Sequence, residues 1–223
     1  HNLEHIRDPF IVLKKFIDNV SDKTIFFVEV PDADLMIKNQ RFDQIFHQHY
    51  HYFNFNSLKN LANRLGCKII GKKINYKFWG GSLMVAFKKD KNVKKKIINK
   101  YEEINGEINK KFKLFKKRFK RLNNALISKN DLIGYGAGQM VSSVAYHLNK
   151  KLPFIEYFVD DNPNRANQKY PFIKGKIKKF DKKYFDKKNK PEVIITALDG
   201  ANSISKKLKK LKVKFYNPIT FNE

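Results

Sequence analysis

The sequence predicts an α/β protein made of two Rossmann-like three-layer units joined by a long helix. Short apolar runs alternate with amphipathic patterns in both halves of the 223-residue chain, which is typical of βαβ architecture. A long apolar stripe with a charged opposite face separates the two halves. We therefore expect domains at residues 1–90 and 129–223, with a linker helix over residues 91–128.

The first unit begins with a helix over residues 10–20, where apolar side chains recur at intervals of three and four. Residues 24–30 are mostly apolar and predict a fully buried strand. A second helix is predicted over residues 55–66. Asn56 or Ser57 suits its N-cap and Gly66 its C-terminal end.

Two strands are predicted next, over residues 68–76 and 82–88. The turn between them contains Gly80 and Gly81. Glycine backbone can approach a ligand closely, but the same dipeptide also suits an ordinary hairpin. Residues 92–127 then carry the apolar stripe of one long helix.

The second unit opens with a strand, a glycine turn over residues 131–140 and a helix over residues 141–149. Gly134 and Gly136 occupy the first two positions of GxGxxG, whereas Gln139 stands at the third. A second strand over residues 155–161 ends in two aspartates. This context favours a nucleotide-binding turn, although the glycines also permit a tight strand-to-helix connection. Further strands are predicted at residues 191–197 and 213–216, with a helix at 201–211 between them.

The most informative segment contains His47, His49 and His51 at two-residue spacing. In an extended backbone their imidazoles would share one face. Three interpretations compete: a loop whose imidazoles bond to backbone, a metal site, and general acid-base chemistry. The single Cys67 has no CxxC partner and no HExxH motif is present, so the sequence favours no metal ligand set.

Several ordered blocks resemble the sugar-nucleotide C-methyltransferases. The blocks are NLEHIRDP, FVEVP, FDQIFHQHYHYFNFNSLKNLANRLGCKII and FWGGSLMV. They are similar to that family's NVLAHIPDP, IEVP, FDxIYHEHxxYFSxxSLxxLxxxxGxxV and HGGSLR. The resemblance implies an S-adenosylmethionine-dependent reaction in which a base removes the proton beside a sugar ketone and the enolate takes a methyl group.

By that resemblance His49 is the base and His5 a second catalytic residue. The substrate-binding positions it implies are Phe46, His47, Gln48, Tyr50, Gly80, Gly81 and Ser82. Three positions depart from the family pattern. Phe46 replaces a tyrosine, Gln48 replaces a glutamate and Trp79 replaces a histidine. The first two exchanges favour an alternative, a protein that binds the nucleotide-linked sugar without catalysis.

The C-terminal half resembles the same family's nucleotide-binding domain, which reads GYGAxxK and VDxNPxKxG. The nucleotide-binding residues it implies are Gly134, Tyr135, Gly136, Ala137, Gly138, Gln139, Asp160 and Asn162. The first residue is His1, and we expect an N-terminally truncated chain whose S-adenosylmethionine site lies mostly upstream.

The amino-acid composition narrows the classes of function and location that remain possible. The formal net charge is +26, but lysine greatly outnumbers arginine and is scattered through every segment, so specific nucleic-acid binding is the less favoured alternative. The single cysteine suits a reducing compartment, and no apolar run is long enough to span a bilayer. We expect a cytoplasmic enzyme with a nucleotide-sugar substrate. The sequence does not indicate its oligomeric state.

Overall fold

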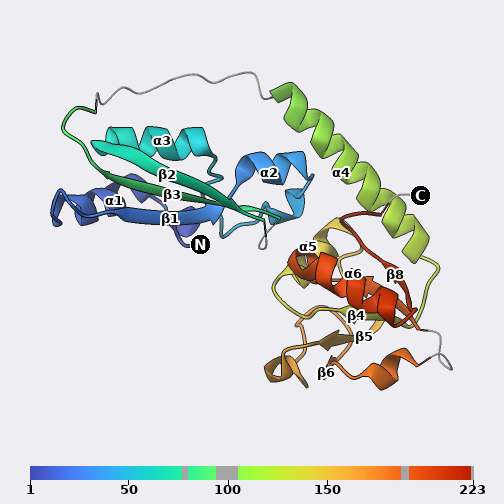
Figure 1. Ribbon diagram of the computed structural model, residues 1–223. Helices are drawn as coiled ribbons and strands as arrows, with labels where there is room; N and C mark the ends of the chain where they lie inside the picture. Colours follow the sequence, from blue (N-terminus) through green and yellow to red (C-terminus); the bar gives the residue numbers. More distant parts are fainter. Residues whose placement is uncertain (77–79, 94–104, 187–190, 222–223) are drawn as a thin grey trace. The chain divides into compact units, whose positions relative to one another are not determined.

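The computed structural model describes residues 1–76, 80–93, 105–186 and 191–221. Helices and strands are mixed throughout, so the predicted α/β class is confirmed (Figure 1). The chain divides into two compact units, His1–Lys111 and Phe112–Glu223. This boundary falls inside the helix that the sequence predicts as a linker.

The first unit contains a three-stranded antiparallel sheet in the order β1-β3-β2 (Figure 1). The predicted hairpin of the last two strands is confirmed. The elements are the 3-10 turns η1 (Leu3–His5) and η2 (Phe42–Gln44), the helices α1 (Pro9–Asp18), α2 (Ala33–Lys38) and α3 (Phe55–Arg64), and the strands β1 (Phe26–Pro31), β2 (Cys67–Asn75) and β3 (Ser82–Lys89). The sequence predicts neither α2 nor the 3-10 turns.

Side-chain caps fix where the two longer helices begin. Asp8 accepts a hydrogen bond from the backbone of Ile11 at the start of α1. The predicted cap of α3 is wrong, because Asn54 is the N-cap. Its side chain accepts a hydrogen bond from the Ser57 N–H, and its own N–H donates to the Ser57 hydroxyl oxygen. Gly66 follows the helix with a positive φ of 70°, as expected.

The core of the first unit lies on one face of its sheet. One buried cluster joins α1, α3 and the strands through Leu13, Ile17, Leu58, Leu61, Val30, Leu83 and Val85. The prediction of a fully buried first strand is wrong, because Phe27 is 71% exposed while Val30 is buried. In its described residues this unit has an antiparallel sheet with its core on one face. The three-layer Rossmann arrangement predicted for it is therefore not what these residues form.

The second unit has a five-stranded parallel sheet in the order β6-β5-β4-β7-β8 (Figure 1). Its elements are the helices α4 (Asn105–Leu126), α5 (Met140–His147) and α6 (Ala201–Lys210), the 3-10 turns η3 (Pro163–Arg165), η4 (Lys182–Phe185) and η5 (Leu198–Gly200), and the strands β4 (Leu132–Tyr135), β5 (Ile155–Asp160), β6 (Ile177–Lys179), β7 (Glu192–Ile195) and β8 (Lys214–Tyr216). Strand β6 is absent from the sequence prediction.

Two buried clusters cover the two faces of this parallel sheet. One cluster includes Leu126 of α4 and Val144 of α5, and the other includes Ile204 and Leu208 of α6. The unit is thus a three-layer α/β/α sandwich, in which the strand order reverses beside β4. The Rossmann-like prediction is confirmed for this half of the chain.

The long helix predicted over residues 92–127 is described in its C-terminal part. Residues 92 and 93 are not helical, residues 94–104 lie outside the described part, and α4 runs from Asn105 to Leu126. Its buried side chains Phe115, Phe119, Leu122 and Leu126 follow the predicted spacing of three and four.

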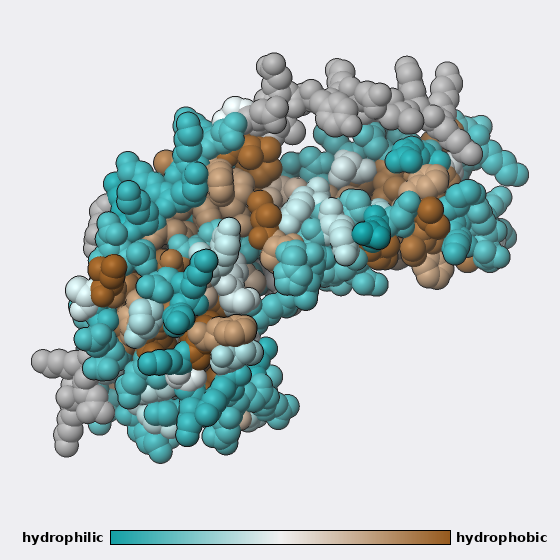
Figure 2. Space-filling view, turned by 180° about the vertical axis from the view of Figure 1, so that it is seen from behind, coloured by the Kyte–Doolittle hydropathy of each residue, from teal (hydrophilic) through white to brown (hydrophobic). Residues whose placement is uncertain are grey.

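The view in Figure 2 shows hydrophilic residues over most of the visible surface, with apolar residues scattered among them. Exposed large apolar side chains occur in both units, for example Phe27 and Phe172. Among the described residues, none of the helices has the length and apolar character needed to cross a membrane.

Candidate functional site

The histidine segment is a turn rather than a strand, so its three imidazoles do not share a face. The backbone N–H of His49 donates to the carbonyl of Phe46 at 3.1 Å, which closes the turn. His47 is exposed, and the Nε2 atom of His51 lies 3.2 Å from the carbonyl oxygen of Arg7. The backbone thus separates His49 from the other two.

The structure brings His49 and His5 together, as the family resemblance implies. Their ring centroids are 4.8 Å apart in an edge-to-face arrangement. The Nδ1 atom of His5 lies 2.9 Å from the carbonyl oxygen of Gln48, which can only accept. The proton of a neutral His5 is therefore on Nδ1, and its Nε2 carries the lone pair.

Aromatic rings enclose the His49 imidazole. The ring centroid of Phe46 lies 4.2 Å from that of His49, and the ring of Tyr52 lies 5.9 Å away. A small pocket beside this imidazole is lined by Pro31, Asp32, Ala33, Met36, Gln44, His49, His51 and Tyr52. Burial raises the pKa of both Asp32 and Tyr52. The surroundings thus favour uncharged side chains.

The same burial lowers the pKa of His49, and the charge of His5 lowers it further. The Glu4 carboxylate and a hydrogen bond to the backbone of Gln44 oppose this shift without overcoming it. His49 is therefore uncharged at neutral pH, and one ring nitrogen holds a lone pair that can accept a proton.

Glu4 is the acidic member of this cluster, and the sequence prediction missed it. Its side chain is 3% exposed, and its Oε1 atom lies 3.5 Å from Nδ1 of His1 and 3.9 Å from Nε2 of His5. Its Oε2 atom is buried without a hydrogen-bond partner. Donor atoms of Glu4, His5 and His49 lie within 4.8 Å of one another, so these are the described residues placed to hold a metal ion.

A buried ion pair supports the loop that leads to His49. The Nε and Nη2 atoms of Arg41 donate to the two carboxylate oxygens of Asp43 at 2.9 and 2.8 Å. Both side chains are at most 4% exposed. This bidentate contact stabilises η2, and η2 ends at Gln44, whose backbone holds His49.

The remaining predicted substrate-binding residues lie around this loop with mixed roles. Tyr50 is 57% exposed, and its N–H donates to the carbonyl of Glu4 at 2.9 Å. Gly80 has a φ of 75°, and a Cβ there would lie 3.3 Å from Nη1 of Arg41. The Ser82 hydroxyl is directed to Glu29, to whose Oε1 it donates at 2.5 Å. Trp79 lies outside the described residues.

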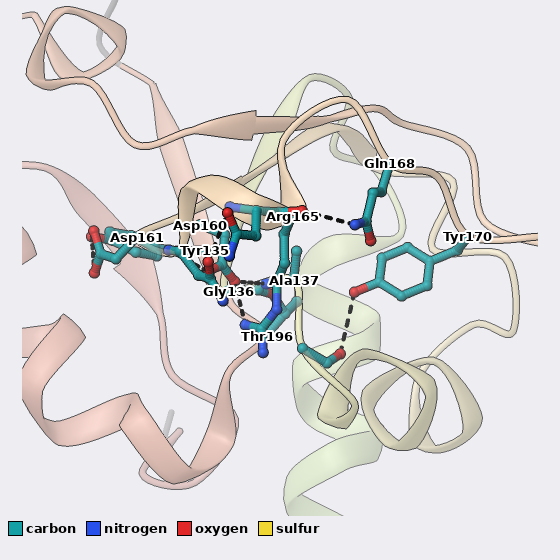
Figure 3. A network of polar contacts seen from close by, with 12 residues as sticks. Tyr135, Gly136, Ala137, Asp160, Asp161, Arg165, Gln168, Tyr170 and Thr196 are labelled. Atoms are coloured by element: carbon teal, nitrogen blue, oxygen red, sulfur yellow. Dashed lines mark hydrogen bonds and ion pairs between the residues drawn. The ribbon is translucent and has the colours of Figure 1, made fainter.

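In the second unit, the glycine turn is closed by an aspartate (Figure 3). The Oδ2 atom of Asp160 accepts hydrogen bonds from the Ala137 N–H at 2.6 Å and from Nη1 of Arg165 at 3.0 Å. Its Oδ1 accepts from the Asn162 N–H at 2.8 Å. Asp160 therefore anchors the turn rather than presenting a bare carboxylate.

The glycines themselves permit close packing of the strands. A Cβ on Gly134 would lie 2.5 Å from the ring of Phe158. Gly136 has a φ of +103°, and a Cβ there would lie 2.2 Å from the Cβ of Ala197. These two predicted nucleotide-binding residues thus have a structural role in addition to any contact with a ligand.

Tyr135 points into the core beside α6. It is 1% exposed, and its hydroxyl donates to Asp161 at 3.0 Å and accepts from Lys207 at 2.5 Å. Burial raises the pKa of this phenol, and the negative charge of Asp161 adds to the shift. Asn162 likewise has a structural role, because its side chain caps η3 through the Asn164 N–H at 3.0 Å.

Arg165 is the cation beside the turn, and the sequence prediction did not include it. A Cβ on Gly138 would lie 3.3 Å from its Nη1 atom, and its side chain is 41% exposed. Gln139 is the N-cap residue of α5. The turn, the arginine and the helix start together offer positive potential to an anionic ligand. The signal in the sequence was the basic position two residues after Asn162-Pro163.

Part of the first unit is similar in sequence to known methyltransferases. Residues 1–72 match the methyltransferase domain family. The chain is also 38% identical over 66 residues to the C-methyltransferase NovU of Streptomyces niveus, an alignment that covers 30% of this chain and 16% of NovU. The match thus spans about a sixth of the length of that relative.

The matched region carries no glycine-rich loop of the kind that commonly holds S-adenosylmethionine. The matched region, residues 1–72, has no glycine before Gly66, so it lacks a glycine-rich turn between a strand and a helix. Its strand β1 is followed by α2, which begins at the capping residue Asp32. Use of this cofactor is implied by the match to a methyltransferase domain.

Proposed function

We propose that this chain is part of an S-adenosylmethionine-dependent C-methyltransferase that acts on a nucleotide-linked ketosugar. The observation that carries the proposal is the His5–His49 pair, in which an uncharged, half-buried imidazole is fixed by backbone contacts on both rings. The match of residues 1–72 to a methyltransferase domain and the similarity to a C-methyltransferase support it.

His49 acts as the base in this proposal. The C–H bond beside the sugar ketone breaks, the electron pair stays on carbon as an enolate, and the proton goes to the imidazole lone pair. A lowered pKa keeps His49 unprotonated at neutral pH, so it is ready to take that proton. S-adenosylmethionine, when bound, supplies the methyl group. His5 positions the substrate from the opposite side of the pair.

The second unit binds the nucleotide part of the substrate in this proposal. Its parallel sheet places the glycine turn and the start of α5 at the carboxyl ends of the strands, where open α/β sheets bind ligands. The Arg165 guanidinium can pair with a diphosphate in a bidentate manner. Gly138 leaves room for that approach, because it has no side chain next to Arg165.

Proton removal can be measured separately from methyl transfer. The full-length protein is incubated in D₂O with nucleotide ketosugars, without S-adenosylmethionine and with EDTA, and deuterium incorporation beside the ketone is followed by NMR. The His49→Asn variant should lose about a hundred- to ten-thousand-fold in exchange rate, as expected for loss of a general base. His51→Asn is the matched control, because the resemblance gives His51 no role and its Nε2 lies 3.2 Å from the backbone carbonyl oxygen of Arg7.

A protein that binds nucleotide-linked sugars without catalysis is the second candidate. Phe46 and Gln48 favour it, since they replace a hydroxyl and a carboxylate of the family pattern with groups that cannot transfer protons. Tight binding of a nucleotide ketosugar, without deuterium exchange in the wild-type protein and without methylation, would establish this candidate and refute the enzyme.

A further inference from the structure

We propose that Glu4, His5 and His49 form a three-ligand site for a divalent transition-metal ion, with Zn²⁺ as the best match. One carboxylate oxygen and two imidazole nitrogens from these residues lie within 4.8 Å of one another. Two imidazoles and one carboxylate are a donor set typical of zinc sites that keep an open coordination position. This inference goes beyond the proposed function and does not depend on it.

Both imidazoles are oriented as metal ligands usually are. A ligating histidine normally donates its second ring N–H to a carbonyl or carboxylate, which fixes the tautomer and leaves the other nitrogen for the metal. His5 does this through Nδ1 and the Gln48 carbonyl at 2.9 Å, and its Nε2 faces Glu4 at 3.9 Å. His49 also has a hydrogen bond to the backbone of Gln44.

The Glu4 carboxylate is the independent observation that points to a ligand. Only 2% of the residue is exposed, and Oε2 is buried without a hydrogen-bond partner. An unpaired oxygen on a buried carboxylate is costly, and metal coordination is one of the ways in which proteins compensate such a group. The other oxygen of the same carboxylate, Oε1, faces Nε2 of His5 at 3.9 Å.

Local geometry allows the ion to enter and to be bound. The His5 side chain is 38% exposed, so one edge of the site is open to solvent. Zn–N and Zn–O distances of about 2.0–2.2 Å bring tetrahedral donors to within about 3.5 Å of each other, so the three groups must move inward by about 1 Å. The surface position of His5 makes this movement possible.

Occupancy would have a direct consequence for the chemistry proposed above. A metal ion bound to His49 takes the lone pair that would otherwise accept the proton. Zn²⁺ should therefore slow deuterium exchange beside the ketone, and EDTA should restore it. Metal binding is measured without substrate or cofactor, so this proposal and the proposed function can fail independently of each other.

The test is calorimetric titration of Zn²⁺ into the untagged, EDTA-stripped chain, with visible absorption of the Co²⁺ complex as a second readout. We expect one Zn²⁺ per chain. Removal of any one ligand should weaken the affinity for Zn²⁺ by at least about a hundredfold, since changes to residues that only support the ligands already cost 10- to 100-fold. The three variants are His5→Asn, Glu4→Gln and His49→Asn. Intense Co²⁺ bands should indicate four- or five-coordinate geometry. His47→Asn and His51→Asn are the matched controls and should leave the affinity unchanged.

The His5→Asn variant keeps the test decisive, because the His5 side chain is exposed and is therefore the proposed ligand that folding needs least. Circular dichroism of each variant checks that the fold is intact. The proposal is overturned if the folded wild-type chain binds no Zn²⁺ below about 100 µM, or if the His5→Asn and His49→Asn variants bind it as tightly as the His47→Asn control.

Discussion

Replacing Asp43 by Asn should strongly destabilise the first unit, because it breaks the buried Arg41–Asp43 pair. Both side chains are at most 4% exposed and share two short hydrogen bonds. Removal of one partner takes this bidentate contact away from a buried charge, which costs about 3–5 kcal/mol. Since a domain is stable by only about 5–15 kcal/mol, this is a large fraction of the total.

The chain contains a matched control for this effect. Lys14 and Asp18 also form an ion pair, with an N–O distance of 2.7 Å, but each side chain is 54% exposed. Asp18→Asn should therefore cost only about 0.3–0.5 kcal/mol. The two substitutions are chemically identical, so the difference between them reports on the burial and the bidentate geometry of the Arg41–Asp43 pair.

Urea unfolding followed by hydrogen-exchange mass spectrometry provides the measurement. Peptides from β3 report on the first unit, and peptides from β7 serve as an internal reference in the second. Asp43→Asn should lower the urea midpoint of β3 and leave that of β7 unchanged. A loss within about 1 kcal/mol of the Asp18→Asn value would refute the assignment of a buried, mutually dependent pair.

Three further predictions concern the second unit. Burial opposes ionisation of Glu192, but hydrogen bonds from Lys214, Tyr216 and Lys129 outweigh it and lower its pKa from 4.5 to about 2. The stability that this carboxylate contributes is present above pH 4.5 and is lost as the pH falls toward 2. In urea unfolding, Glu192→Gln should therefore lower the free energy of unfolding by up to about 3 kcal/mol at pH 6 and by much less at pH 2.5. An equal cost at both pH values would contradict this. Gly136→Ala should destabilise the second unit by about 2–4 kcal/mol, because the φ of Gly136 is +103° and the new Cβ would meet Ala197. A thermal midpoint within about 2 °C of the wild-type value would argue against that contact. In calorimetry, Arg165→Ala should weaken the binding of a nucleoside diphosphate about tenfold, and Arg165→Lys should have an intermediate effect. An unchanged affinity would show that Arg165 is not part of the nucleotide site.

Periodicity was sufficient to predict most regular elements, because each depends on local contacts repeated along the chain. α3, β3, β4 and α6 begin within two residues of their predicted starts. The errors occur where one local pattern fits two environments. A run of apolar residues predicts a strand buried on both faces, but β1 has its core on one face and leaves Phe27 exposed on the other.

The candidate site was only partly predictable, for a related reason. His49 and His5 were found through ordered sequence blocks, and they do lie together. Glu4 and the Arg41–Asp43 pair were not found, because their environments depend on contacts between distant segments. A single glutamate in a one-turn 3-10 helix carries no periodic signal that would distinguish a buried carboxylate from a solvated one.

The site depends on short turns that are stabilised by specific bonds rather than by regular structure. The carbonyl of Glu4 accepts hydrogen bonds from the N–H groups of Tyr50 and His51 at 2.9 and 3.3 Å, so the first turn of the chain is tied directly to the histidine loop. This tie uses the backbone of Glu4 and not its carboxylate. A Glu4→Gln variant therefore keeps the link between the two segments and changes only the charge beside the imidazoles. Any loss of metal affinity or change of reactivity in that variant then reports on the carboxylate itself, and not on the position of the loop.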